Sequence, residues 1–323
     1  MIKMGLIGLG KMGQYHLNLY DEINGLALAG ICDTEAARAE AIGKKCSTPH
    51  FSDYKKLLPL ADAVTIAAPT KYHYEIAKTC LNEGKHVLVE KPITTNYEEA
   101  EELFETAAKK GLVLNIGHVE RFNGAVMELK KIVKNPILFE ARRVGPFNPN
   151  FRNDSIVLDL MIHDIDIAAS IGGKAEAVQA MGSPVNTSLA DYASVNIFFG
   201  GKLSAHIISG RVNQTKERFL NVTQDDALIV LDYTNQDINI TRNWQTAQIF
   251  GDKALTYKNE FVQERLFVYK ENALKAEIKH FLSCIGGLSE KITSPEHDLA
   301  SLKLALTIDS LLLKGRYGEV VLN

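Results

Sequence analysis

The chain has 323 residues, of which 46% are hydrophobic and 23% charged, with a formal net charge of −3. This length and composition predict about two globular domains. The weak negative charge gives no general attraction to nucleic acid or to an anionic membrane. No apolar run approaches the roughly 18 residues that span a bilayer, and the glycine-broken N-terminus lacks the pattern of a signal peptide. We therefore expect a soluble, cytoplasmic protein with neither nucleic acid nor a membrane as partner.

The four cysteines are scattered through the sequence and form no CxxC pair. This pattern favours neither a zinc knuckle nor a redox motif, and we expect no metal site. Buried, reduced thiols fit the same cytoplasmic compartment.

Residues 1–118 alternate short apolar runs with patterns of helical length. The expected strands are Lys3–Gly8, Leu26–Cys32, Ala63–Ala67, His86–Val89 and Leu112–Ile116. The expected helices are Met12–Asp21, Glu35–Lys44, His73–Glu83 and Tyr97–Lys109. Such alternation predicts an α/β domain with a doubly wound parallel sheet, covered by helices on both faces.

The pattern changes in residues 119–323. Helices are expected at Arg121–Lys134, Ile156–Ile171, Asn272–Ile285 and Pro295–Lys314. Between about Ala175 and Tyr257 the chain shows successive strands, with Gly200-Gly201 as a hairpin turn. The second domain is therefore expected to be α+β, with a mainly antiparallel sheet.

A glycine pattern follows the first expected strand. Gly8-Leu9-Gly10-Lys11-Met12-Gly13 matches G-x-G-x-x-G and opens a helix. The three glycines allow a tight turn, close approach to a pyrophosphate, and packing of helix against strand. The N–H groups at the helix start favour the phosphates. The order of these features predicts a Rossmann domain that binds a dinucleotide.

The second expected strand is followed by Asp33, 20 residues after Gly13. A carboxylate there hydrogen-bonds the adenosine ribose and repels the additional phosphate of NADP, so NAD is favoured. Thr34 and Arg38 lie nearby in the sequence. Arg38 could stack on the adenine or partly restore NADP binding.

Two later segments carry candidate catalytic residues. Lys91, in Glu90-Lys91-Pro92, follows a parallel strand, whose end faces the ligand crevice in such sheets. Asp159, His163 and Asp166 are spaced i, i+4, i+7 and are expected to share one helix face.

With Ala68-Pro69-Thr70 and His73, these motifs resemble those of the glucose–fructose oxidoreductase/inositol dehydrogenase/MocA (Gfo/Idh/MocA) family. The resemblance implies oxidation of a secondary hydroxyl of a sugar or cyclitol by hydride transfer to nicotinamide. It implies that Lys91 hydrogen-bonds the reacting hydroxyl, that His163 is the general base, and that Asp159 orients the substrate or the histidine. The residues expected at the cofactor are Gly8, Gly10, Lys11, Met12, Gly13, Asp33, Thr34, Arg38, Ala68, Pro69, Thr70, His73, Glu90 and Lys91.

A narrower resemblance lies at His118-Val-Glu-Arg-Phe-Asn123. It is similar to the V-E-R-F-N-P segment of the branch that includes UDP-N-acetylglucosamine 3-dehydrogenases and MviM-type proteins, although Gly124 replaces the proline. A nucleotide-sugar is therefore a candidate substrate. Arg121 is either a cofactor or substrate contact or part of a structural salt bridge.

Other substrate candidates are Arg152 and Asp166. Arg142, Arg143 and Arg152 surround a loop rich in Pro and Asn, where solvated charges are favoured over a phosphate contact. Two alternative functions remain open: a non-catalytic dinucleotide sensor, and an imine or carbonyl reductase of the same fold. A homo-oligomer, dimer or tetramer, is expected through the C-terminal sheet.

Overall fold

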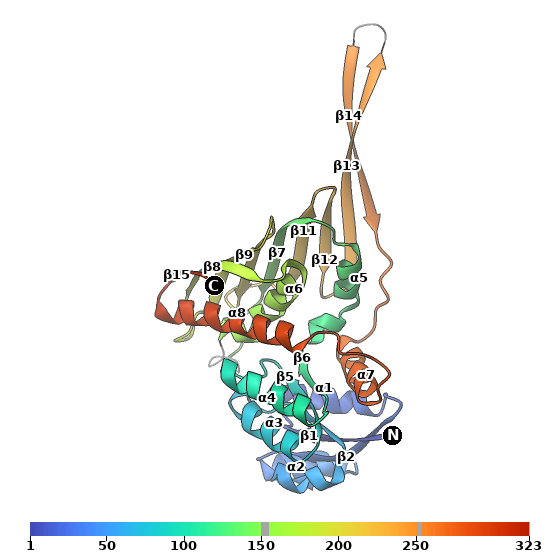
Figure 1. The fold of residues 1–323 in the computed structure, drawn as a ribbon, viewed down its shortest axis with the longest axis vertical. Helices are drawn as coiled ribbons and strands as arrows, with labels where there is room; N and C mark the ends of the chain where they lie inside the picture. Colours follow the sequence, from blue (N-terminus) through green and yellow to red (C-terminus); the bar gives the residue numbers. More distant parts are fainter. Residues whose placement is uncertain (150–154, 251–253, 323) are drawn as a thin grey trace. The chain divides into compact units, whose positions relative to one another are not determined.

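A computed structural model of the chain describes residues 1–149, 155–250 and 254–322. The chain divides into two compact units (Figure 1). The first contains Met1–Phe122 and Asn272–Leu306, and the second contains Asn123–Glu271 and Thr307–Asn323. These units are defined by contacts, and the division of the sequence into domains after residue 118 stays a prediction. No helix in the described ranges has the length and apolar character needed to cross a membrane.

The first unit contains a six-stranded sheet in the order β3-β2-β1-β4-β5-β6. Every neighbouring pair is parallel, which confirms the predicted Rossmann sheet. Its strands are β1 (Ile2–Ile7), β2 (Leu26–Cys32), β3 (His50–Phe51), β4 (Ala63–Ile66), β5 (His86–Glu90) and β6 (Leu114–Gly117). Its helices include α1 (Lys11–Tyr20), α2 (Ala36–Lys45), α3 (His73–Asn82), α4 (Tyr97–Lys109) and α7 (Ala273–Ile285). The order reverses beside β1, where such sheets bind their ligands.

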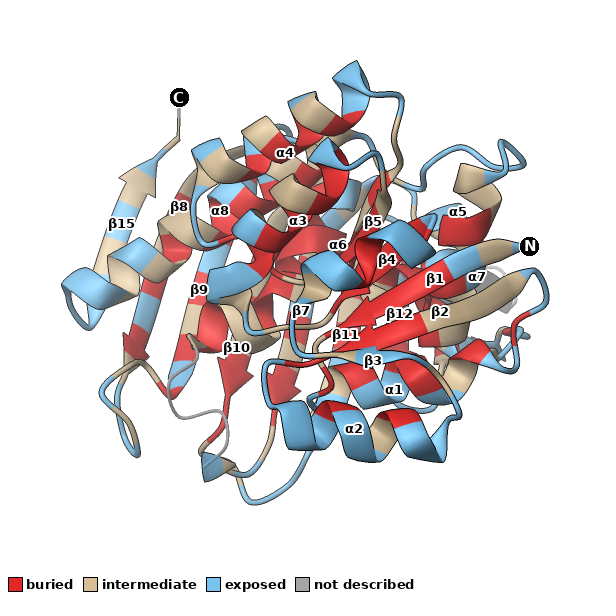
Figure 2. Ribbon diagram, turned by 90° about the horizontal axis from the view of Figure 1, so that it is seen from below, coloured by how far each residue is buried: buried red, intermediate tan, exposed pale blue. Residues whose placement is uncertain are grey.

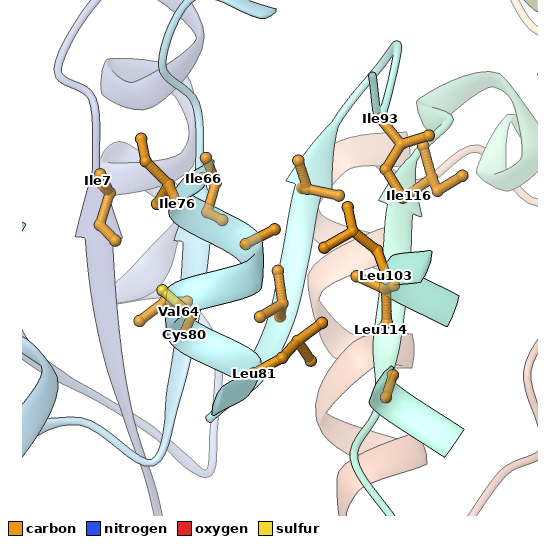
Figure 3. Close-up of a cluster of buried hydrophobic side chains, with 14 of the residues drawn as sticks. Ile7, Val64, Ile66, Ile76, Cys80, Leu81, Ile93, Leu103, Leu114 and Ile116 are labelled. Carbon is orange, nitrogen blue, oxygen red and sulfur yellow. The ribbon is translucent and has the colours of Figure 1, made fainter. Parts of the chain in front are cut away.

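Two hydrophobic clusters cover the two faces of this sheet. One lies between the sheet and α3 and α4, where Ile76, Leu81 and Leu103 meet strand residues such as Val64 (Figure 3). The other joins the opposite face to α1 and α7. Figure 2 shows the resulting pattern, with buried inner strands and exposed outer faces on α2 and α3. Each fully buried aliphatic side chain contributes about 1.5–3 kcal/mol relative to exposure.

The second unit contains a nine-stranded sheet in the order β14-β13-β12-β11-β7-β10-β9-β8-β15. Among the described strand pairs of this sheet, only β7–β10 is parallel, so the mainly antiparallel sheet is confirmed. Its strands are β7 (Pro136–Val144), β8 (Ala175–Ser183), β9 (Tyr192–Phe199), β10 (Ser204–Gly210), β11 (Glu217–Gln224), β12 (Ala227–Asp232), β13 (Asp237–Phe250), β14 (Ala254–Arg265) and β15 (Tyr317–Val321). Helices α5 (Gly124–Ile132) and α6 (Ile162–Gly172) belong to this unit, and α8 (Pro295–Lys314) ends in it.

The helix expected at Arg121–Lys134 starts later than the sequence pattern indicates. A 3-10 turn occupies Val119–Phe122, and α5 begins only at Gly124. Asn123 caps α5, because its Oδ1 accepts a hydrogen bond of 3.1 Å from the N–H of Ala125. This cap excludes Arg121 from the helix. Two short strands, β3 and β15, had no clear signal in the sequence.

A two-stranded arm extends from the second unit. Strand β13 pairs with β12 only from Asp237 to Thr241, but it pairs with β14 as far as Phe250. Beyond Thr241 the two strands of the arm are therefore paired only with each other within the described ranges. Figure 1 shows the arm reaching past the other strands of this unit.

Candidate active site

The glycine loop has the geometry that dinucleotide binding requires. Gly8 has a φ of +93°, and a Cβ atom there would lie 2.6 Å from the backbone of Ala67. A Cβ on Gly13 would lie 1.9 Å from the carbonyl oxygen of Gly8. By contrast, a Cβ on Gly10 would meet nothing within 4 Å, so this side of the loop is open. The first and third glycines are thus required for packing, and the second leaves room for a pyrophosphate.

Gly10 is the N-cap of α1, and no acidic residue lies in the first turn of this helix. Lys11 and Met12 follow it, with Lys11 exposed. The Lys11 ammonium lies 5.8 Å from the ring centre of Tyr15. The loop and the start of α1 therefore offer backbone N–H groups and a nearby cation to a phosphate.

Asp33 follows β2 and is tied to the glycine loop. Its Oδ2 accepts a hydrogen bond of 2.9 Å from Leu9 N–H, and its Oδ1 accepts one of 2.9 Å from Glu35 N–H. Arg38 Nη1 lies 3.1 Å from the same Oδ2, and its guanidinium also contacts the Glu35 carboxylate. Arg38 is thus paired with two carboxylates, and the adjacent Thr34 is exposed. These residues fit NAD, because a carboxylate is present where NADP would place its additional phosphate.

The loop after β4 is tied to the loop after β5 through His73. One ring nitrogen of His73 lies 2.7 Å from the carbonyl oxygen of Ala68, and the other lies 2.8 Å from that of Pro92. Burial lowers the pKa of His73 below its ordinary value. Pro69 continues the first of these loops, and Thr70 begins the 3-10 turn Thr70–Tyr72 that precedes α3. A buried histidine therefore connects two segments that the sequence assigns to the cofactor.

Glu90 is the last residue of β5, and Lys91 follows it. The Glu90 Oε1 lies 2.7 Å from Nε2 of His16, which is on α1 and is completely buried. Oxygen Oε2 of Glu90 faces Gly117, where a Cβ atom would lie only 3.0 Å away. The segment that carries Lys91 is thus anchored through Glu90 at the carboxyl end of the parallel strands.

The catalytic candidates of the second unit lie around the start of α6. Asp159 is in a π-helical turn, Val157–Met161, and its N–H donates a hydrogen bond of 2.8 Å to the carbonyl oxygen of Ser155. Single π-helical turns are frequent at functional sites. His163 is the second residue of α6 and is half-buried, as is Asp159. Asp166, also a predicted site residue, is 1% exposed.

A buried ion pair anchors α6 to β7. Arg143 Nε donates to Asp164 Oδ2 at 2.7 Å, and Arg143 Nη2 donates to Asp164 Oδ1 at 3.1 Å. The Arg143 guanidinium also lies 4.6 Å from the ring centre of Tyr233. The expectation of a solvated or phosphate-binding charge at Arg143 was therefore wrong, because the side chain is 1% exposed and points into the unit. Since Asp164 adjoins His163, this pair positions the candidate base.

Two further arginines were substrate candidates. Arg121 is buried in the first unit, with Nη2 at 2.7 Å from Asp298 Oδ1 and Nη1 at 2.7 Å from Thr293 Oγ1. The structural salt bridge foreseen for Arg121 is thus present, and a substrate contact stays a prediction. Arg152 lies outside the described residues.

His16 and Glu277 are buried polar residues that the sequence analysis missed. Glu277 occupies the apolar face of α7, at the helical spacing of Leu274, Ile278 and Phe281. A charged residue among apolar residues at this helical spacing can be recognised in the sequence, and it indicates a buried charged group. Among the described residues, no group of three or more His, Cys, Asp and Glu side chains has an arrangement that could hold a metal ion.

Two family models match the chain. Residues 2–118 match a model described as "Oxidoreductase family, NAD-binding Rossmann fold", and residues 135–254 match the "GFO/IDH/MocA C-terminal domain".

Individual relatives agree with these models. A UDP-N-acetylglucosamine 3-dehydrogenase of Acidithiobacillus ferrooxidans is 31% identical over 88% of this chain and 88% of its own. A solved structure of that enzyme has a TM-score of 0.86, with 29% identity over 96% of this chain and 97% of the other. A scyllo-inositol 2-dehydrogenase (NAD⁺) of Bacillus subtilis is 30% identical, but over only 57% of this chain and 58% of its own.

Proposed function

Since the chain belongs to the Gfo/Idh/MocA family of oxidoreductases, we propose that it oxidises a secondary hydroxyl of a nucleotide-sugar, with NAD as cofactor. The 3-hydroxyl of UDP-N-acetylglucosamine is the first candidate. One observation carries this choice: the similarity to the UDP-N-acetylglucosamine enzyme continues through nearly the whole chain, whereas the inositol enzyme matches about half. The longer match compares nearly the whole chain with its relative and is therefore the more informative one.

Each catalytic candidate has a defined task in this reaction. NAD, when bound, provides the acceptor for the hydride that leaves the carbinol carbon. Lys91 donates a hydrogen bond to the reacting oxygen and stabilises the negative charge that develops there. His163 takes the hydroxyl proton as general base, and Asp159 orients the substrate or the imidazole. The products are a ketone, NADH and one proton, which His163 releases to solvent.

The preference for NAD follows from the surroundings of Asp33. In this proposal its carboxylate accepts hydrogen bonds from the adenosine ribose, while Arg38 is already paired with Asp33 and Glu35. A phosphate on that ribose would be repelled directly by the Asp33 carboxylate. The nearby cation, Arg38, would attract it only weakly, because two carboxylates have largely neutralised its charge. NADP is therefore the weaker cofactor.

The test is a substrate panel scored by NADH absorbance. It compares UDP-N-acetylglucosamine, UDP-glucose, free N-acetylglucosamine, scyllo-inositol and a simple glucoside. We expect the highest kcat/KM for UDP-N-acetylglucosamine, and a 3-keto product by mass spectrometry and NMR. Faster turnover of inositol or of the glucoside would contradict the nucleotide-sugar assignment. NAD binding without turnover of any compound would favour the sensor. A second panel of imines and ketones, assayed with NADH, tests the reductase, which turnover in that panel alone would favour.

We also propose a homo-oligomer, a dimer or tetramer, assembled through the sheet of the second unit. One face of this sheet bears large hydrophobic residues that are each more than a third exposed: Met181, Tyr192, Phe198, Phe219 and Leu228. They alternate along their strands with buried residues, so they share the open face. The two-stranded arm supports the same assembly, because an isolated strand pair is marginally stable in water. Light scattering that gives the mass of one chain at micromolar concentration would contradict it.

A cytoplasmic location completes the proposal. All four cysteines are free thiols. Free thiols, two of them buried, suit a reducing compartment. Fractionation of the producing cells, with the protein detected by antibody, tests this location.

A further inference from the structure

A carboxyl group lies inside the first unit without a hydrogen-bonding partner in the part of the chain that the structure describes. Glu277 of α7 is 1% exposed, and neither of its side-chain oxygens has a hydrogen-bond partner among the described residues. Its neighbours on the same helix face, Leu274, Ile278 and Phe281, belong to the core cluster. A buried carboxylate without a partner is expensive, whereas the neutral acid is tolerated at much lower cost. The position therefore favours a carboxylic acid that keeps its proton.

Two of the neighbouring charged groups, Arg121 and Glu90, already have partners of their own. Arg121 is engaged by Asp298 and Thr293, at 2.7 Å each. Glu90 is engaged by His16, also at 2.7 Å. Burial and the negative charge of Glu90 raise the pKa of Glu277 well above its ordinary value, and Arg121 opposes this only in part.

The charged groups that surround the Glu277 carboxyl come from several helices, strands and loops. The titratable and charged groups around it are His16 of α1, Glu90 of β5, Arg121 of the 3-10 turn, Lys291 of the loop after α7, and Asp298 of α8. Any titration of Glu277 must be interpreted against all of them.

A small cavity adjoins the carboxyl. Glu277 lines it together with Asn115, Arg121, Lys291 and Thr293. The cavity has a volume of about 10 Å³ for the centre of a water molecule. This suits a single water that has several polar partners. A water at this place would accept the hydrogen bond that a protonated Glu277 donates. Protonated Glu277 can thus donate its hydrogen bond to a water molecule while the existing ion pairs stay intact.

We propose that Glu277 is a positioning residue that, as a neutral carboxylic acid, keeps Glu90 beside His16 and thereby keeps Lys91 in place. Ionisation of Glu277 would bring a second negative charge close to Glu90 in a medium of low dielectric constant. The two carboxylates would repel each other, and the repulsion would act on the contact between Glu90 and His16. The repulsion would thus displace Glu90, the residue that precedes Lys91. The inference rests on the proposed role of Lys91 in the reaction.

The experiment compares the unmodified protein with Glu277→Gln, a neutral side chain of the same shape. The matched control is Glu101→Gln, at an exposed position on α4. Because the raised pKa belongs to the folded state, the stability that Glu277 contributes is complete below the ordinary pKa of about 4.3. It is lost as the pH rises through the folded-state pKa. We therefore expect the Tm advantage of Glu277→Gln over the unmodified protein to grow with pH, and that of Glu101→Gln to stay constant.

The positioning role has readouts of its own. Above the pH at which Glu277 ionises, the unmodified protein should lose about tenfold in NAD affinity and in kcat/KM relative to Glu277→Gln. Below that pH, the two should agree within about threefold, less than the tenfold of one pKa unit. Difference infrared spectra should show a protonated-carboxyl band that Glu277→Gln removes.

Two results would overturn the inference. Parallel Tm curves together with no such infrared band would mean that Glu277 is ionised. If the Tm values of the unmodified protein and Glu277→Gln diverged with pH, but their NAD affinities and the pH profiles of kcat/KM were identical, Glu277 would have a purely structural role. NAD affinity and infrared spectra need no substrate, so this test stays informative if the proposed reaction fails.

Discussion

Oδ2 of Asp33 accepts a hydrogen bond of 2.9 Å from the backbone N–H of Leu9, which ties the end of β2 to the glycine loop. One carboxylate thus shapes the phosphate loop and, in the proposed NAD complex, would also accept hydrogen bonds from the adenosine ribose. Effects of changing Asp33 on loop geometry and on charge must therefore be separated.

Asp33→Ser should narrow or reverse the preference for NAD. The change removes the charge that opposes the additional phosphate of NADP and releases Arg38 to meet it. We expect the ratio of NAD to NADP affinity to fall by at least about tenfold, equivalent to ~1.4 kcal/mol. Asp33→Asn is the matched variant, because it removes the charge but keeps an acceptor for Leu9. Measured affinities that favour NADP in the unmodified protein would show that the role given to Asp33 is wrong.

Lys91→Met should abolish most turnover and leave NAD binding nearly unchanged. The methionine keeps an apolar stem of similar length, but it cannot donate a hydrogen bond to the developing alkoxide. Loss of one such donor typically costs about 10²–10³ in kcat. Cofactor fluorescence measures binding, and NADH absorbance measures turnover. Lys56→Met, at an exposed position, is the control and should behave normally. Normal activity of Lys91→Met would remove Lys91 from the mechanism.

His163→Asn should lower the rate of oxidation by about 10²–10⁴, the usual contribution of general base catalysis. NAD affinity should change little, since the histidine belongs to α6 of the second unit and not to the glycine loop. Single-turnover kinetics separates the chemical step from product release. The exposed His50→Asn is the control. If His163→Asn retained its rate, another group would have to be the base.

The ion pair of Arg143 and Asp164 should contribute strongly to the stability of the second unit. Arg143→Met leaves a buried carboxylate without its cation, and the expected loss is about 3–5 kcal/mol in the free energy of unfolding. Arg142→Met is a control on the same strand, because Arg142 pairs with Glu217 at the surface, where ion pairs contribute about 0–1 kcal/mol. Urea denaturation measures both. Equal losses for the two variants would contradict the difference in burial.

Local sequence signals predicted much of the fold. The glycine pattern, the apolar strands and Asp33 lie within a few dozen residues of one another, and their spacing reflects a single strand–helix–strand unit. The start of α5 was missed because the cap at Asn123 competes with a helical pattern that begins earlier. At such a position, one side-chain hydrogen bond decides where the helix begins.

The environment of the buried charges could not be read from local patterns. Asp164 is 21 residues from Arg143, and Asp298 is more distant still from Arg121. Which charges meet depends on how strands and helices pack, and each arginine alone fits a surface role equally well. Glu277 had a signal in the apolar spacing of α7, but its meaning depends on Glu90, which comes from a remote part of the chain.

Helix α7 gives the chain an order of assembly during synthesis. The strands of the first unit are complete at residue 117, yet Leu274, Ile278 and Phe281, which complete its core, follow the whole of Asn123–Glu271. A ribosome-bound chain therefore displays the apolar surface of α1 until those residues emerge, and that surface is a natural target for chaperones. Proteolytic cleavage within the second unit, followed by loss of the C-terminal piece, would destabilise the nucleotide-binding unit as well.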